Sequence, residues 1–156
     1  MFSVRVVNLG DTLTSIGKFD TEFNTKLKKI ILSNAYQIER NAKKRVPVDT
    51  GKLRSSIRVQ IYLGGLSVDV GSDLPMAKYV EYGTPPHRSS KDHDVFVAAI
   101  KAWSRRHGKE SYWYPILHKI QTHGTQPRPY LNNSFNEQRS KINDDISSLV
   151  NTKELI

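Results

Sequence analysis

Apolar residues recur every three or four positions between residues 19 and 42, and this spacing predicts one long amphipathic helix. Its apolar face comprises Phe19, Phe23, Leu27, Ile30, Ile31, Ala35, Ile38 and Ala42. The basic run Lys43-Lys44-Arg45 is favourable at the negative end of a helix dipole, and Pro47 prevents the helix from continuing. Upstream, residues 1–17 show no sustained period, so we expect a short strand at 4–7 and then a flexible segment.

Residues 57–70 alternate between apolar and polar positions on both sides of Gly64-Gly65, a pattern that predicts a β-hairpin. A two-residue turn at the glycines places every apolar side chain on the same face of the hairpin. The predicted pairs are Leu63 with Leu66, Ile61 with Val68, and Val59 with Val70. The preceding residues 48–51 are typical of a turn.

Shorter periodic segments predict four more helices in the second half of the chain. We expect one at 74–82 with Ser72 as its cap, and one that begins at Asp94 and stops at Gly108. Two others run from about residue 115 to Gly124 and along 131–149, with a frayed tail after 150.

Residues 82–88 and 123–128 nearly repeat each other, since both contain Gly-Thr followed by proline and arginine. The repeat predicts one Gly-Thr junction that is split by an inserted helical hairpin at about 86–123, here called the insertion. The expected fold is a single α+β domain over 1–156. It has an antiparallel β-sheet with a central hairpin packed against two long helices, plus the inserted helical hairpin, and flexible ends at 1–17 and 150–156.

The chain has a formal net charge of +9 and no cysteine. Its basic residues concentrate in 1–60 and 85–131, which leaves contact with a polyanion open beside the simpler interpretation that lysines keep the protein in solution. The absence of cysteine excludes disulfides and favours a reducing compartment, so we expect synthesis in the cytoplasm. No apolar stretch approaches the roughly 20 residues that a membrane span requires.

The candidate catalytic and metal-binding residues lie within or next to the insertion. Its five histidines could suggest zinc, but they show no HExxH spacing and have no cysteine beside them. Asp92 and Asp94 could suggest a nuclease, but no second carboxylate cluster completes a two-metal site. We therefore expect no enzyme, no metal and no cofactor. The histidines are His87, His93, His107, His118 and His123.

Four local patterns occur in an order that resembles one family of phage proteins. They are Ala42-Lys43 followed by Val46-Pro47-Val48-Asp49-Thr50-Gly51-Lys52-Leu53-Arg54-Ser55-Ser56-Ile57; Ala77-Lys78-Tyr79-Val80-Glu81-Tyr82-Gly83-Thr84; Ile100-Lys101-Ala102-Trp103; and Gly124-Thr125-Gln126-Pro127-Arg128-Pro129-Tyr130-Leu131. Together they resemble the minor tail-component, or tail-completion, proteins of lambdoid and related long-tailed bacteriophages.

This resemblance implies a structural virion protein at the head–tail neck, made in the host cytoplasm, that assembles into a ring and enables head–tail joining. Its implied partners are other copies of itself, the adjacent head-closure, tail-terminator or tail-tube proteins, and genomic DNA contacted without sequence preference. The family has no catalytic residue to carry over. Two alternatives stay open: another neck role, as tail terminator or head closure, and a non-specific DNA-binding protein.

The sequence also suggests which residues make these contacts, although each motif has a purely structural alternative. Turn residues, core aromatics and a solvated helix end would explain the same patterns. We expect Arg54 to pair with Glu81 and Trp103 to lie in the core. The candidate subunit-interface residues are Asp49, Thr50, Gly51, Arg54, Tyr82, Gly83, Thr84, Tyr112, Trp113, Tyr114, Arg128 and Tyr130. The candidate DNA-facing residues are Lys43, Lys44, Arg45, Arg105, Arg106 and Lys109.

Overall fold

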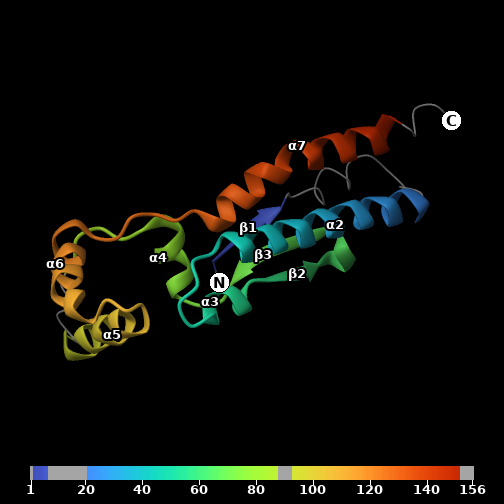
Figure 1. Ribbon diagram of the computed structural model, residues 1–156. Helices are drawn as coiled ribbons and strands as arrows, with labels where there is room; N and C mark the ends of the chain where they lie inside the picture. Colours follow the sequence, from blue (N-terminus) through green and yellow to red (C-terminus); the bar gives the residue numbers. More distant parts are fainter. Residues whose placement is uncertain (1, 7–20, 88–92, 152–156) are drawn as a thin grey trace.

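The computed structural model describes residues 2–6, 21–87 and 93–151 (Figure 1). Most residues of the predicted flexible ends, 1–17 and 150–156, lie outside the described residues. The described part of the N-terminal segment is a strand at residues 2–6, close to the one expected at 4–7. In chain order the elements are β1 (Phe2–Val6), α2 (Thr21–Arg45), α3 (Lys52–Ser56), β2 (Arg58–Tyr62), the 3₁₀ turn η1 (Leu63–Gly65), β3 (Ser67–Ser72), α4 (Met76–Tyr82), α5 (His93–Arg106), the 3₁₀ turn η2 (Glu110–Tyr112), α6 (Trp113–His123) and α7 (Tyr130–Asn151).

The body of the protein has two layers, a sheet and a pair of helices. The sheet has the strand order β1-β3-β2 with both pairings antiparallel, and α2 and α7 run in opposite directions side by side over it (Figure 1). This arrangement confirms the predicted α+β class. Between the two helices, the buried Asn34 donates from Nδ2 to an Asp145 carboxylate oxygen at 3.1 Å. The buried core comprises Phe23, Leu27, Ile31, Ala35, Ile38, Ala42, Val46, Leu53, Ile57, Val68, Val70, Ala77, Tyr130, Leu131 and Ile142.

The hairpin has the predicted register but a different turn. Val59 pairs with Val70 and Ile61 with Val68, as expected. The predicted turn was wrong, because the strands already end at Tyr62 and Ser67 and residue 63 belongs to the turn. Leu63 has a φ of 49° and a side chain that is 70% exposed, so it faces solvent and does not extend the buried face.

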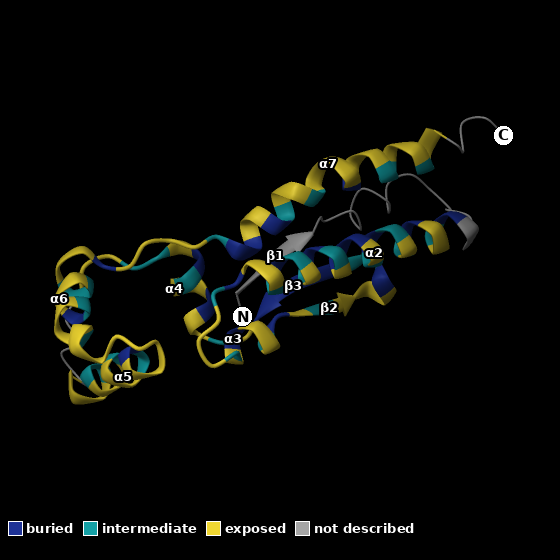
Figure 2. Cartoon of the chain, viewed as in Figure 1, coloured by how far each residue is buried: buried dark blue, intermediate teal, exposed yellow. Residues whose placement is uncertain are grey.

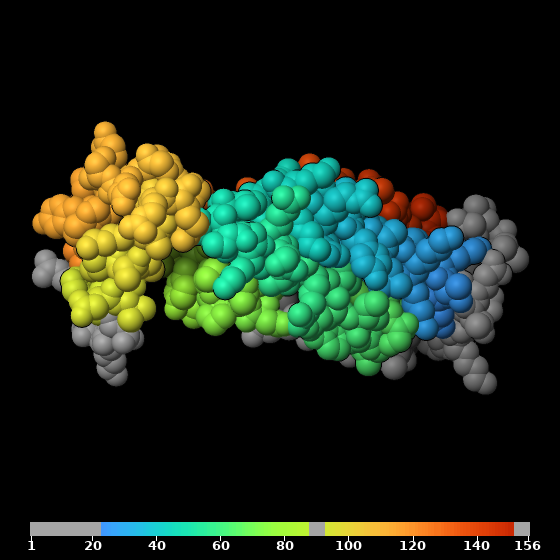
Figure 3. Space-filling model, turned by 60° about the horizontal axis from the view of Figure 1, so that its bottom comes forward, coloured from blue at the N-terminus to red at the C-terminus, as the bar shows by residue number. Residues whose placement is uncertain are grey.

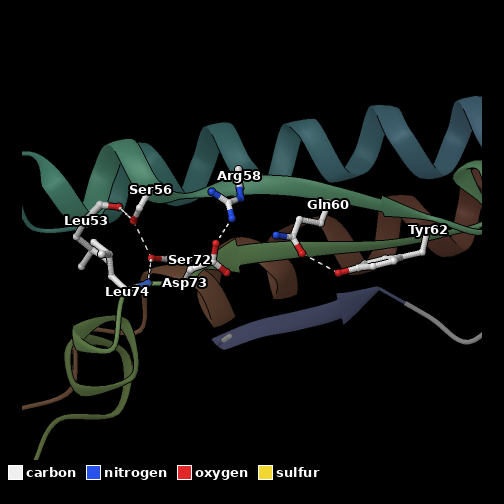
Figure 4. A network of polar contacts seen from close by, with 8 residues as sticks. All are labelled: Leu53, Ser56, Arg58, Gln60, Tyr62, Ser72, Asp73 and Leu74. Carbon is white, nitrogen blue, oxygen red and sulfur yellow. Dashed lines mark hydrogen bonds and ion pairs between the residues drawn. The ribbon is translucent and has the colours of Figure 1, made fainter.

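A short helix that the sequence pattern did not predict, α3, joins α2 to the hairpin and is held by a serine network (Figure 4). The Ser56 hydroxyl lies 2.8 Å from the Leu53 carbonyl oxygen and 2.7 Å from the Ser72 hydroxyl. Ser72 in turn accepts a hydrogen bond from the Leu74 backbone N–H at 3.1 Å. The predicted cap was therefore wrong: Ser72 is committed to this network, and Pro75 stands at the N-cap of α4 without a side-chain cap bond.

The insertion forms a lobe of its own beyond the end of the body (Figure 3). It consists of α5, η2 and α6, and the residues buried within these elements are Ser104 and Leu117 (Figure 2). The prediction that Trp103 lies in the core was wrong, because its ring is only half-buried in this lobe and stacks on His107 with centroids 4.4 Å apart. The lobe therefore buries little apolar surface within its own elements.

Within the described residues, no helix has the length and apolar character that crossing a membrane requires.

Candidate functional site

The insertion leaves and rejoins the body through two paired segments, residues 83–85 and 124–126, here called the stalk. Thr84 and Thr125 form an antiparallel bridge in which each backbone N–H donates to the other residue's carbonyl oxygen at 3.1 Å. Their hydroxyl oxygens lie 3.0 Å apart. The two near-repeat segments of the sequence thus face each other at the base of the insertion.

Gly83 and Gly124 occupy equivalent places in the stalk, each with a φ of 72°. A Cβ on Gly83 would lie 2.3 Å from the Thr125 carbonyl oxygen, and a Cβ on Gly124 would lie 1.9 Å from the Thr84 carbonyl oxygen. Both obstacles are backbone atoms that themselves belong to the threonine bridge. Only glycine therefore combines this φ with such a close approach of the two chains.

A second contact between the body and the insertion joins the turn before α3 to the end of α5. The Asp49 carboxylate accepts hydrogen bonds from Arg106, at 2.9 Å from Nε and 2.6 Å from Nη2. The same carboxylate lies 3.1 Å from Nε2 of His107, whose ring stacks on Trp103. We call Asp49, Arg106 and His107 the clasp, because they join positions 57 and 58 residues apart in sequence.

The clasp lowers the pKa of Asp49 below its ordinary value of 3.8. The main cause is the hydrogen bond from Arg106; partial burial acts in the opposite direction, and the hydrogen bond from His107 lowers the pKa further. A depressed carboxylate pKa stabilises the folded state above the ordinary value. That contribution is lost as the pH falls through the lowered pKa, so the clasp is complete at neutral pH and weakens below about pH 4.

We expect Arg106→Gln to raise the pKa of Asp49 towards its ordinary value, because the substitution removes the largest cause of the shift. The measurement is a pH titration of the Asp49 carboxyl carbon by NMR. Arg105→Gln is the matched control, since the neighbouring Arg105 pairs with Glu110 and not with the clasp. Equal Asp49 titration curves for the wild type and Arg106→Gln would show that the clasp does not form in solution.

The body side of the stalk is anchored by Glu81, whose side chain is 1% exposed. Its two carboxylate oxygens accept hydrogen bonds from the backbone N–H groups of Leu131 and Asn132 at 2.9 and 2.8 Å. These donors belong to the first turn of α7, where helix N–H groups have no partner within the helix. The predicted Arg54–Glu81 pair was therefore wrong, because the start of α7 occupies the carboxylate.

Two candidate interface residues, Arg128 and Tyr130, lie where the chain enters α7. The Arg128 backbone N–H donates to the Val80 carbonyl oxygen at 2.8 Å, and the Arg128 side chain is exposed. Tyr130 is 2% exposed, so its ring belongs to the core and not to the free surface. Burial, with the nearby Glu81 carboxylate as a second cause, raises the pKa of the Tyr130 hydroxyl to about 12.

Exposed aromatic side chains gather on α4 and at the start of α6. Tyr82, Tyr112 and Tyr114, all predicted from the sequence, are 61 to 65% exposed. On α4 they are joined by Tyr79, an aromatic residue of the sequence motif that was not among the predicted interface residues, and by Met76, which the sequence reasoning missed. Met76, Tyr79 and Tyr82 follow one another at intervals of three along a helix, a spacing that could have revealed this stripe. We call these three residues the α4 stripe.

The α4 segment lies next to the inserted lobe (Figure 3), and the three side chains of the α4 stripe are exposed. Of the other candidate interface residues, Thr50 and Arg54 are exposed and Trp113 is half-buried. Gly51 has a φ of 79° immediately before α3, so the turn requires it for backbone geometry. The predicted interface residues are thus divided among the turn before α3, α3 itself, the end of α4, the stalk, the insertion and the start of α7.

Acidic neighbours pair with most of the candidate DNA-facing residues. Arg106 is held in the clasp, Arg105 lies 3.3 Å from Glu110, and Arg45 lies 3.1 Å from Glu137. Lys43 pairs with Glu39 within α2, and Lys44 and Lys109 are exposed. The two clusters lie on different elements, at the ends of α2 and α5. Most of these cations therefore neutralise the protein's own carboxylates.

Across residues 2–6, 21–87 and 93–151, the structure brings together no group of three or more side chains that could hold a metal ion. His107 is committed to the clasp, and the His87 ring packs 5.7 Å from that of Phe96. His123 shares a hydrogen bond with the Thr122 hydroxyl. These three histidines thus make contacts of different kinds.

Comparison with protein-family models gives a match to part of this chain. Residues 9–83 match the family described as "Bacteriophage HK97-gp10, putative tail-component". No curated protein and no solved structure matches. The matched region runs from ahead of α2 to Gly83, where the stalk begins, so the insertion and α7 lie beyond it. Residues 9–83, which include the Asp49–Gly51 turn and α4, are thus similar to the HK97-gp10-like family of phage tail components.

Proposed function

We propose that this protein is a subunit of the phage head–tail neck, a tail-completion protein that assembles into a ring and enables the tail to join the head. The carrying observation is the match of residues 9–83 to a phage tail-component family. The finer assignment to the neck rests on the ordered motifs of the sequence, which continue past the matched region to Leu131.

The distribution of exposed apolar surface supports a role in assembly. The α4 stripe exposes about half or more of each of its side chains, at 50% for Met76, 49% for Tyr79 and 65% for Tyr82. Large aromatic side chains of this kind are frequent anchors of protein–protein interfaces. The stripe lies next to the stalk, so a neighbouring subunit seated there would also contact the insertion.

The test is electron microscopy of lysates from a phage that lacks this gene, complemented with wild type or with single variants. We expect full heads beside separate tails without complementation, and joined particles with wild type. Tyr79→Lys places a charge in the α4 stripe and should restore joining poorly. Tyr36→Lys is the matched control, because Tyr36 is equally exposed, at 51%, but lies on α2.

The outcomes also separate the alternatives. Overlong tails in the deletion lysate would indicate a tail terminator, and heads that have lost their DNA would indicate head closure. Normal joined particles without the gene would contradict the neck role altogether. Non-specific DNA binding would then be the leading alternative, and its signature would be an affinity that falls steeply with salt concentration.

A further inference from the structure

An open depression of about 790 Å³ lies on the insertion, between the end of α5 and the start of α6. Here it is called the α5–α6 cleft, and it is lined by Lys101, Arg105, Gly108, Glu110, Ser111 and Trp113. It lies outside the clasp, the stalk and the α4 stripe. Its volume falls in the range of ligand-binding sites. Its wide opening suits a chain segment that passes through it better than an enclosed small molecule.

The cleft combines cations with an aromatic ring. Lys101 and Arg105 stand one helical turn apart on α5, and the Lys101 ammonium lies 4.4 Å from the centre of the Trp113 ring. Gly108 adds no obstruction, since a Cβ there would meet nothing within 4 Å. This arrangement offers two positive charges, a hydroxyl from Ser111 and a partly apolar floor to one ligand.

The Glu110 carboxylate, which already lies in the cleft, shows the kind of group that Arg105 binds there. Glu110 lies 3.3 Å from Arg105, and the two side chains are 69% and 74% exposed. An ion pair exposed to this extent contributes little stability, so an incoming carboxylate can replace Glu110 at small cost. The planar fork of arginine binds carboxylates through two parallel hydrogen bonds.

Two carboxylates, those of Glu110 and Asp49, disfavour the binding of a polyphosphate in this cleft. Glu110 lies in the cleft itself, and Asp49 holds the adjacent Arg106 away from it. A nucleic-acid backbone would place several phosphates near these two carboxylates, whereas a peptide can present one carboxylate to Arg105 and an apolar side chain to Trp113. Charge complementarity therefore favours a protein partner over DNA.

We propose that the α5–α6 cleft binds an acidic peptide segment of a partner protein, with a carboxylate on Arg105 and Lys101 and an adjacent apolar side chain on Trp113. This binding site goes beyond the proposed neck function and does not depend on it, because it rests on the chemistry of the cleft alone. Loss of the neck role in the phage experiment would leave this inference standing.

The test uses the full-length protein and the acidic peptide acetyl-Gln-Glu-Leu-Gln-Gln-amide, which carries one carboxylate beside an apolar side chain. The glutamine peptide acetyl-Gln-Gln-Leu-Gln-Gln-amide is its uncharged counterpart. The chain has two tryptophans, so NMR follows two indole N–H signals. We expect the acidic peptide to shift the Trp113 signal more than the Trp103 signal, and the glutamine peptide to shift neither.

Variants then test which side chains bind the peptide. Arg105→Gln should raise the Kd about fivefold, the change that corresponds to one exposed ion pair. Glu110→Gln should lower the Kd, because it removes the competing carboxylate. Lys119→Gln is the matched control, since it removes an exposed charge of α6 that does not line the cleft.

Three results would overturn the proposal. The first is equal binding of the acidic and glutamine peptides, or of neither. The second is an equal loss of affinity in Arg105→Gln and Lys119→Gln. The third is tighter binding of a short double-stranded DNA than of the acidic peptide in about 0.15 M salt with the same Trp113 shift, which would assign the cleft to nucleic acid.

Discussion

Gly124→Ala is expected to open the stalk while leaving the body folded. The new methyl group would lie 1.9 Å from the Thr84 carbonyl oxygen, at a backbone conformation that alanine adopts only under strain. Relief requires the two segments to separate, which breaks the Thr84–Thr125 bridge. Hydrogen exchange measured by NMR should show the amides of Thr84 and Thr125 exchanging about a hundredfold faster or more, with amides in the middle of α2 unchanged.

Gly108→Ala is the matched control for this experiment. Gly108 also has a positive φ, 64°, but a Cβ there would meet nothing within 4 Å. Its substitution should cost only about 1–2 kcal/mol of local backbone strain and leave the exchange rates of Thr84 and Thr125 as they are. Equal protection of the stalk amides in Gly124→Ala and wild type would contradict the close approach of the two chains.

Glu81→Gln is expected to lower the free energy of unfolding by about 3 kcal/mol, because Glu81 is buried and both of its carboxylate oxygens accept hydrogen bonds from backbone N–H groups of α7. Glutamine has nearly the same shape but one acceptor oxygen, so its amide group would face an N–H of α7. It also removes a negative charge from the positive end of the helix dipole. Urea unfolding, monitored by circular dichroism at neutral pH, measures the change.

Glu137→Gln provides the comparison. Glu137 also lies on α7 and pairs with Arg45 and Asn41, but its side chain is 48% exposed. Its substitution should cost less than about 1 kcal/mol. If Glu81→Gln destabilised the protein no more than Glu137→Gln, the carboxylate of Glu81 would not be the anchor of α7.

The parts of the fold that the sequence predicted well are those fixed by local periodicity. The α2 helix and the hairpin register follow from apolar spacing, because only one face of each element can be buried. The hairpin turn was mispredicted because Leu63 adopts a positive φ, which is rare for a residue with a branched side chain. The five residues of α3 were too few for a periodic signal, although Leu53 and Ile57, one helical turn apart, are both buried.

The contacts that define the candidate site depend on long-range packing. Glu81 meets α7 across about 50 residues of sequence, and Asp49 meets Arg106 across 57. Nothing in the local pattern distinguishes these carboxylates from others in the chain, so Arg54 was an equally reasonable partner for Glu81. The repeated Gly-Thr segments are the exception, because their similarity pointed to the stalk before their pairing was visible.

The closeness of the two ends of the insertion has a consequence for how this protein can diversify. The chain leaves the body at Thr84 and returns to it at Thr125, and the antiparallel bridge holds these two residues next to each other. The path of the chain from α4 to α7 within the body therefore does not depend on what lies between them. Loops with adjacent ends tolerate changes of length at small entropic cost. Descendants of one ancestral body could therefore acquire, lose or exchange the inserted lobe, and with it their choice of neighbours, in single genetic steps.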